Sequence, residues 1–215
     1  RLNTWLSSQT SAGILFETDL RLRPNGDSGL LAVSVDAFRD YQLKHAWVWE
    51  HQALTRARFC AGDPAVGERF EAIRSEILRQ QRELGKLREE VIAMRRKMLD
   101  AHASHSENEF DLKQDPGGII DVEFIVQYLV LGYAHQHAKL TGNLGNIALL
   151  RIAGELGLIE PEQAEAVGNA YREYRRLQHA KRLNANPQAR NDRESLEKHI
   201  AAVNRLWHTF FGGER

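Results

Sequence analysis

The residues best suited to chemistry lie on one face of a segment near the N-terminus. Polar and apolar side chains alternate over residues 13–23, which is typical of a half-buried strand. The polar face carries, in order, Glu17, Asp19, Arg21 and Arg23. A carboxylate can bind Mg²⁺ and guanidinium groups can hold phosphate oxygens, but a solvated face with cross-strand ion pairs uses the same residue types. The pattern leaves a metal–phosphate site and a plain surface both open.

The turn after this strand could supply further phosphate ligands. Residues 24–29 read Pro-Asn-Gly-Asp-Ser-Gly, and Asn-Gly is a strong turn signal. Backbone N–H groups, including that of Gly29, and the Ser28 hydroxyl are suitable donors to a polyphosphate. We expect residues 30–33 to return as a second short strand, so that the two form a hairpin and not a whole sheet.

A second candidate lies where two glycines precede an apolar helix expected over residues 120–135. Backbone N–H groups at a helix N-terminus bind phosphate readily. Asp121 lies in the first turn, where an acid also interacts with the helix dipole. Glu123 lies on the one polar stripe of this helix, and a buried carboxylate must be paired. A structural ion pair from Glu123 to Arg56 or Arg58 and a catalytic role are both open.

An almost wholly helical chain must position these side chains. Periodicity predicts a helix or helix pair over residues 35–59 that Ser34 caps, and an amphipathic run over residues 66–98 that breaks between Gln80 and Gly85. Further helices are expected over residues 120–135, 145–156, 161–183 and 193–211. The expected fold class is mainly α, a helical bundle preceded by a short β-hairpin.

The composition excludes several classes of protein. Of the 215 residues, 42% are hydrophobic, which is enough for a core and argues against disorder. Lys plus Arg and Asp plus Glu both total 29, so the net charge of zero argues against a nucleic-acid binder. The single cysteine excludes an intrachain disulfide, which is consistent with a protein of the reducing cytoplasm. No apolar run approaches the roughly 20 residues of a membrane span. The absence of an initiator Met predicts a piece of a longer protein.

Three motifs together resemble one family. They are Phe16-Glu-Thr-Asp-Leu-Arg-Leu-Arg-Pro-Asn-Gly-Asp-Ser-Gly29, Ala46-Trp-Val-Trp-Glu-His-Gln-Ala-Leu-Thr-Arg-Ala-Arg58 and Gly117-Gly-Ile-Ile-Asp-Val-Glu-Phe-Ile-Val-Gln-Tyr-Leu-Val-Leu131. They look like glutamate–ammonia ligase (glutamine synthetase) adenylyltransferase, over residues 15–183. That family has an N-terminal deadenylylating half and a C-terminal adenylylating half. Asp121 before Val122-Glu123, and His51-Gln52 after Trp49-Glu50, resemble the C-terminal half.

The resemblance implies a polymerase-β-like nucleotidyltransferase palm followed by a helical bundle. Residues 1–34 would be the end of the palm and residues 35–215 the bundle. The palm's Gly-Ser-x-Asp-x-Asp motif is absent from the chain, and Asp19 matches the third carboxylate. We therefore expect the chain alone to be inactive.

The implied reaction is in-line attack by a tyrosine hydroxyl of glutamine synthetase on the α-phosphorus of ATP, assisted by Mg²⁺. By resemblance, Asp19 would carry the metal, and Asp121 and Glu123 would join it from the bundle as catalytic residues. The resemblance assigns phosphate and nucleotide binding to Arg21, Arg23, Ser28 and Gly29.

Three alternatives to the adenylylating half are open. Two share its chemistry, namely the deadenylylating half and the uridylyltransferase of the nitrogen-signalling protein PII, which has the same bundle type. The third is a non-catalytic module that docks glutamine synthetase or PII. The expected partners are glutamine synthetase and, through the full-length enzyme, PII, with no nucleic acid and no membrane.

Overall fold

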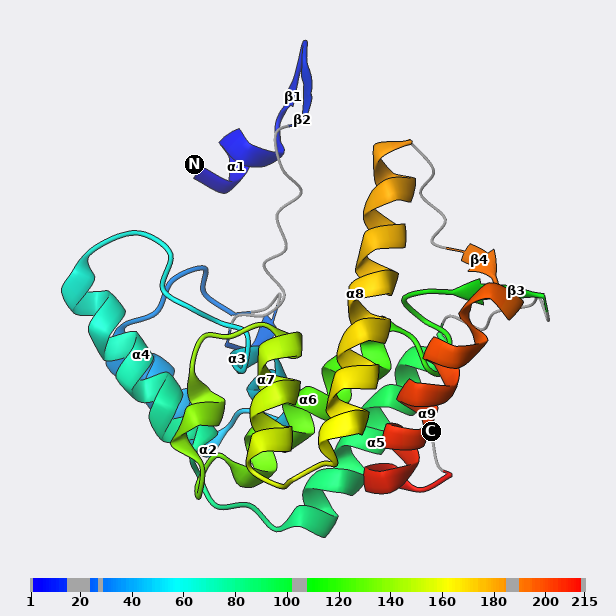
Figure 1. Cartoon of the computed structure of the whole chain (residues 1–215). Helices are drawn as coiled ribbons and strands as arrows, with labels where there is room; N and C mark the ends of the chain where they lie inside the picture. The colour runs from blue at the N-terminus through cyan, green and yellow to red at the C-terminus, as the bar shows by residue number, and fades with distance from the viewer. Residues whose placement is uncertain (1, 15–23, 27–28, 102–107, 185–189, 214–215) are drawn as a thin grey trace. The chain divides into compact units, whose positions relative to one another are not determined.

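The computed structural model describes residues 2–14, 24–26, 29–101, 108–184 and 190–213. The chain divides into two compact units, Arg1–Ala46 and Trp47–Arg215. Most of the described residues are helical, as the sequence predicts (Figure 1). The first unit extends past residue 34, and the predicted domain boundary at that residue stays a prediction.

The N-terminal unit begins with helix α1 (Leu2–Ser7) and a hairpin of β1 (Gln9–Thr10) and β2 (Gly13–Ile14). Strand β2 is the start of the predicted strand, whose remainder lies outside the described residues. The predicted partner at residues 30–33 is wrong, because those residues form no strand and β2 pairs with β1. A two-residue connection allows this local pairing, with Gly13 at a φ of 103°.

The predicted Asn-Gly turn and helix cap are both present in this unit. Asn25 and Gly26 have φ values of 62° and 53°, the left-handed conformation that such a turn requires. The Asn25 N–H donates to the Tyr41 hydroxyl at 3.1 Å, which ties the turn to helix α2 (Val35–Lys44). Ser34 caps α2, since its Oγ accepts the backbone N–H three residues on at 3.2 Å.

The second unit contains the remaining elements. The α-helices are α3 (Val48–Leu54), α4 (Pro64–Leu78), α5 (Leu84–Asp100), α6 (Ile119–Tyr133), α7 (Asn146–Glu155), α8 (Pro161–Leu183) and α9 (Glu197–Phe211). Short 3₁₀ helices are η2 (Ala138–Thr141) and η3 (Glu194–Leu196). Strand β3 (Glu109–Asp111) pairs antiparallel with β4 (Arg190–Asp192). The helix pair over 35–59 and the break between α4 and α5 are therefore confirmed.

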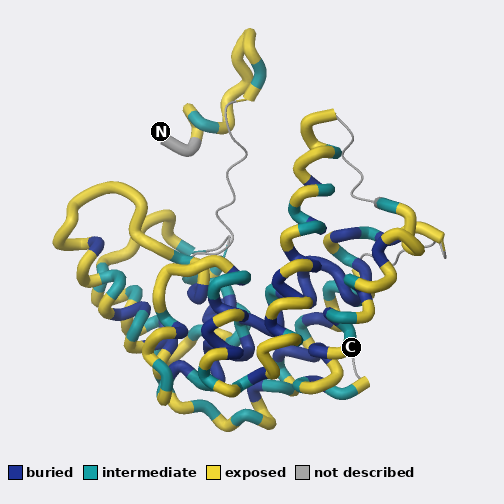
Figure 2. The backbone as a smooth tube through the Cα atoms, in the orientation of Figure 1, coloured by how far each residue is buried: buried dark blue, intermediate teal, exposed yellow. Residues whose placement is uncertain are grey.

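Helix α6 is the central element of this unit. Twelve of its 15 residues are buried, because its sequence is apolar on nearly every side. Helices α3, α5, α7, α8 and α9 all pack against it, and Figure 2 shows the buried backbone concentrated there. Aromatic side chains of α9, including the fully buried Trp207 and Phe211, fill the space beside α5 and α6. None of the described helices is both long and apolar enough to cross a membrane.

Candidate functional site

The sequence-predicted nucleotide face lies mostly outside the described residues. This applies to Asp19, Arg21, Arg23 and Ser28, so their metal and phosphate roles stay predictions. Gly29 is described, and its N–H donates to the carbonyl of Gly26 at 3.1 Å. In this conformation that N–H closes the turn.

Asp121 lies at the core of the second unit in a buried ion pair. Arg95 Nε donates to Asp121 Oδ1 at 2.6 Å, and both side chains have zero exposure. Asp121 Oδ2 accepts the Gly117 N–H at 2.7 Å, and the same arginine donates to the Gln114 carbonyl at 2.6 Å. Asp121 therefore fixes the glycine loop before α6 onto α5. This burial favours a structural role, and catalysis by Asp121 stays an untested prediction.

Glu123 lies on a different side of the same helix and meets two other helical segments. Arg56, just after α3, donates from Nη1 to Glu123 Oε1 at 2.7 Å, which confirms the predicted ion pair to one of two arginines. The Tyr171 hydroxyl of α8 donates to the same oxygen at 3.2 Å. Oε2 of Glu123 accepts no hydrogen bond from the described residues. With 21% of the Glu123 side chain exposed, that oxygen can meet a ligand.

One helical turn further along α6 the polar contact continues. Gln52 of α3 donates from Nε2 to Gln127 Oε1 at 2.9 Å. The two pairs follow from helical spacing, since Glu123 and Gln127, like Gln52 and Arg56, are four residues apart. We call this set the polar seam. It consists of Gln52, Arg56, Glu123, Gln127 and Tyr171.

A buried arginine holds the end of α3 that presents Arg56. The Arg74 guanidinium, on α4, is 2% exposed and donates to the carbonyls of Leu54 and Thr55 at 3.0 and 2.7 Å. These carbonyls belong to the last turn of α3, where backbone acceptors lack partners within the helix. A third bond, at 2.8 Å, runs to the carbonyl of Thr141. Burial lowers the pKa of Arg74, which is the cost of placing a cation there.

Electrostatics in the seam favour a neutral Tyr171 hydroxyl. Burial, and then the negative charge of Glu123, raise the pKa of the Tyr171 hydroxyl. The hydroxyl therefore stays protonated and acts as a donor to Glu123. Arg56, whose side chain is 53% exposed, supplies the compensating positive charge at the open side of the seam.

The described residues do not fit a metal centre. Asp121 and Glu123 are each paired with a guanidinium group, which competes with a cation for the carboxylate. Within the described ranges no three His, Cys, Asp or Glu side chains group together as metal ligands.

Sequence reasoning missed Arg95 and Tyr171 as members of these clusters. Arg95 had a signal, because it follows Leu87 and Val91 at four-residue intervals on the apolar stripe of α5. A cation in such a stripe must find a buried acid. Tyr171 had none, since an amphipathic helix buries tyrosines as ordinary core residues.

Two family models match successive parts of the chain. Residues 1–73 match the model described as glutamate–ammonia ligase adenylyltransferase. Residues 85–203, more than half of the chain, match the model described as GlnD PII-uridylyltransferase. The second range holds Asp121, Glu123 and Tyr171. Both descriptions name enzymes that transfer a nucleotidyl group, and they define the class.

Curated relatives narrow the class of nucleotidyl-transferring enzymes to one kind. The bifunctional glutamine synthetase adenylyltransferase/adenylyl-removing enzyme of Aromatoleum aromaticum is 69% identical over 86% of this chain and 20% of that enzyme. The enzymes of the same name from Nitrosomonas europaea and Chromobacterium violaceum are each 56% identical over 98% of this chain, and over 24% and 23% of their own lengths. The chain belongs to the glutamate–ammonia ligase adenylyltransferase family. It spans about a fifth to a quarter of the length of these relatives.

Proposed function

We propose that this chain is part of the adenylylating half of a bifunctional enzyme that transfers AMP from ATP to a tyrosine of glutamine synthetase. Residues 1–34 are, in this proposal, the end of a nucleotidyltransferase palm, and residues 35–215 are its helical bundle. The observation that carries it is the polar seam, where two motifs of the family resemblance meet. Arg56 belongs to the motif at residues 46–58 and Glu123 to the motif at residues 117–131, and Arg56 Nη1 lies 2.7 Å from Glu123 Oε1.

The seam supplies an oriented carboxylate. Arg56 and Tyr171 together hold one oxygen of Glu123 and leave the other to accept a hydrogen bond. A hydroxyl group of the substrate is a suitable donor, and a fixed acceptor lowers the entropic cost of aligning it for attack. Glu123 then orients the attacking tyrosine or the nucleotide ribose, while Arg56 keeps the carboxylate in place.

The resemblance assigns the metal to Asp19. Magnesium, when bound, would neutralise charge on the phosphates and on the attacking oxygen. Arg21 and Arg23 would hold phosphate oxygens through charge-assisted hydrogen bonds. In the full-length enzyme, Asp19→Asn is expected to lower AMP transfer at least about a hundredfold, roughly 2.7 kcal/mol of transition-state stabilisation, with an unchanged melting curve. Near-normal transfer would make this strand face an ordinary surface.

Glu123→Gln in the full-length enzyme tests the role of the seam. Glutamine keeps the shape and an acceptor oxygen but loses the charge that binds Arg56. We expect AMP transfer to fall by about 10²-fold in kcat, with removal of AMP from modified glutamine synthetase unchanged. If Glu123→Gln instead abolishes the removal of AMP and leaves AMP transfer unchanged, the chain belongs to the deadenylylating half.

Matched controls separate this role from docking and from folding. Glu155→Gln removes an exposed carboxylate that also pairs with an arginine, Arg151 on α7, and is expected to leave transfer unchanged. A raised KM for glutamine synthetase with unchanged kcat in Glu123→Gln would favour the docking module. The chain alone, incubated with labelled ATP, Mg²⁺ and glutamine synthetase, should transfer no label. Metal-dependent labelling by the chain alone would refute the expectation that the other two metal-binding carboxylates of the palm lie in another segment of the enzyme.

A further inference from the structure

The C-terminal half of α8 concentrates positive charge that the polar seam does not use. Residues 172–182 contain four Arg, one Lys and a single acid, although the whole chain is neutral. At about 100° per residue, five of these side chains fall within an arc of roughly 120° on the helix. We call them the basic face of α8. They are Arg172, Arg175, Arg176, His179 and Arg182.

The basic face is open to solvent. All of its residues are exposed except Arg175, which is half-buried. In Figure 1 the last turns of α8 extend past the ends of α7 and α9, and Leu183 at the tip is 87% exposed. A ligand can therefore approach this face without displacing a neighbouring helix.

The helix dipole does not account for this charge. Cations stabilise the C-terminus of a helix, but the effect falls off within the last turn. Only Lys181 and Arg182 lie in that turn of α8. Arg172, Arg175 and Arg176 lie about two turns or more before the end, where like charges three and four residues apart repel one another.

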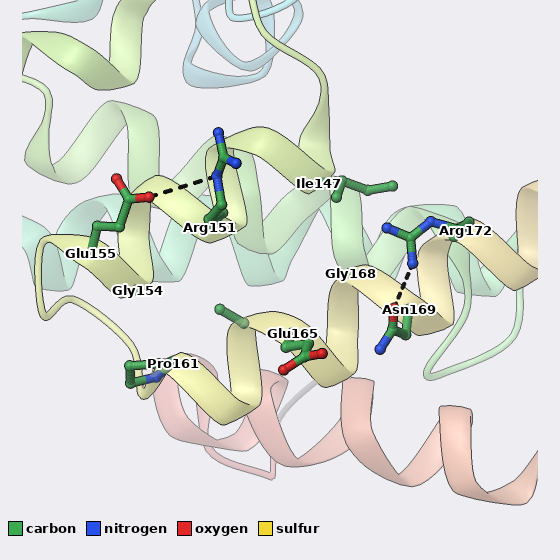
Figure 3. A pocket seen from close by; sticks show the side chains of 10 residues that line it. Ile147, Arg151, Gly154, Glu155, Pro161, Glu165, Gly168, Asn169 and Arg172 are labelled. Carbon is green, nitrogen blue, oxygen red and sulfur yellow. Dashed lines mark hydrogen bonds and ion pairs between the residues drawn. The ribbon is translucent and has the colours of Figure 1, made fainter.

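Most of the positive charge on this face has no carboxylate partner. Arg176 pairs with Glu173 at 2.6 Å. Arg172 donates to Asn169, at one end of a groove of about 430 Å³ between α7 and α8 (Figure 3), and Arg175 donates to Gln178 at 3.2 Å. Both acceptors are neutral amides. Among the described residues, no acid forms an ion pair with Arg172, Arg175 or Arg182.

The basic face is continuous with the polar seam. Burial and the charge of Glu123 raise the pKa of the Tyr171 hydroxyl, and Arg175 and Arg56 oppose that rise. Arg175 follows Tyr171 by one helical turn and borders both surfaces. A ligand on the basic face would therefore lie on the same helix as Tyr171 of the polar seam.

We propose that the basic face of α8 binds a polyphosphate chain through Arg172, Arg175 and Arg176. The guanidinium fork matches phosphate oxygens and donates two hydrogen bonds to one group. The guanidinium groups of Arg172 and Arg175 donate only to neutral amides, whereas that of Arg176 is shared with Glu173. Three guanidinium groups within about one turn suit a ligand with several adjacent negative groups. This inference rests on the proposed function, which supplies two sources of that chemistry, the triphosphate of ATP and the pyrophosphate that leaves.

Calorimetric titration of the full chain with inorganic triphosphate at low salt tests the proposal. We expect saturable binding that weakens as salt rises, because the contacts are solvent-exposed charges. The double variant Arg172→Gln and Arg175→Gln should bind at least tenfold more weakly, about 1.4 kcal/mol. Arg151→Gln, an exposed arginine of α7, is the matched control and should stay within twofold of the parent sequence. Unchanged binding by the double variant, or no binding by the parent sequence, overturns the proposal.

Parallel titrations distinguish the source of the phosphates and the class of ligand. ATP binding with at least tenfold weaker AMP supports a triphosphate site, and pyrophosphate binding as tight as triphosphate supports the leaving product. A poly-glutamate peptide that binds more tightly than triphosphate would assign the face to an acidic protein and overturn the proposal. If triphosphate does not bind while AMP transfer still depends on Glu123, this inference alone fails. Triphosphate binding with no AMP transfer by the full-length enzyme would refute the proposed function alone.

Discussion

Asp121→Ala is expected to be the most destabilising single change among the acids of the predicted site. Asp121 and Arg95 are both fully buried, and the substitution leaves the guanidinium charge without its partner. It also leaves the Gly117 N–H without its acceptor. Removing one member of a buried pair costs about 3–5 kcal/mol, because the remaining charge stays desolvated. With a urea m-value of roughly 2 kcal/mol/M, the midpoint should fall by about 1.5–2.5 M.

Urea unfolding followed by tryptophan fluorescence is a suitable assay, because Trp207 is fully buried in the same unit. Glu155→Gln, at an exposed ion pair, should change the free energy of unfolding by less than about 1 kcal/mol. Replacing both partners, Arg95→Met with Asp121→Leu, should recover most of the loss, because no buried charge remains. A midpoint shift below about 0.5 M for Asp121→Ala would refute the structural reading of this pair.

Three further outcomes are expected from the same core. Tyr174→Phe should be neutral or stabilise by about 1 kcal/mol in thermal unfolding, because the buried Tyr174 hydroxyl has no hydrogen-bond partner among the described residues. Burial, and then the charge of Asp121, raise the pKa of this hydroxyl. The free energy of unfolding should therefore fall above pH 10.0, where the phenol ionises in the unfolded chain but not in the folded one. Tyr174→Phe should lessen that fall in urea titrations between about pH 9 and about pH 11. Gly117→Ala should cost about 1–3 kcal/mol by urea unfolding, since φ is 92° and a Cβ would lie 3.0 Å from Asn204 Oδ1.

Most of the helical elements could be predicted because their signals are local. The predicted and observed bounds of α8 coincide at both ends. Pro161 marks the start of the helix, and the helical periodicity ends at Leu183. The strand pairs had no comparable signal. Strand β1 has two residues, too few to show alternation, and β3 pairs with β4 across about 80 residues of sequence. Such pairing depends on contacts that no sequence window contains.

The candidate site was predictable only where spacing constrains it. Glu123 lies on the polar stripe of an apolar helix, where a buried carboxylate must be paired, and an ion pair to Arg56 or Arg58 was one of the two open interpretations. Spacing could not identify Tyr171, which comes from a helix nearly 50 residues away and contributes a hydroxyl to the same oxygen. The role of Asp121 depended on Arg95, whose place in the core becomes clear only when α5 and α6 are packed together.

The two acids of the Asp-Val-Glu motif lie on different faces of helix α6. Residues two apart on a helix point about 200° away from each other, so Asp121 and Glu123 must face different surroundings. The structure places Asp121 against Arg95 in the core and Glu123 in the polar seam. One acid therefore anchors the glycine loop that begins α6, and the other can receive a ligand. Of the two acids, Glu123 is the one whose side chain is partly exposed in this conformation.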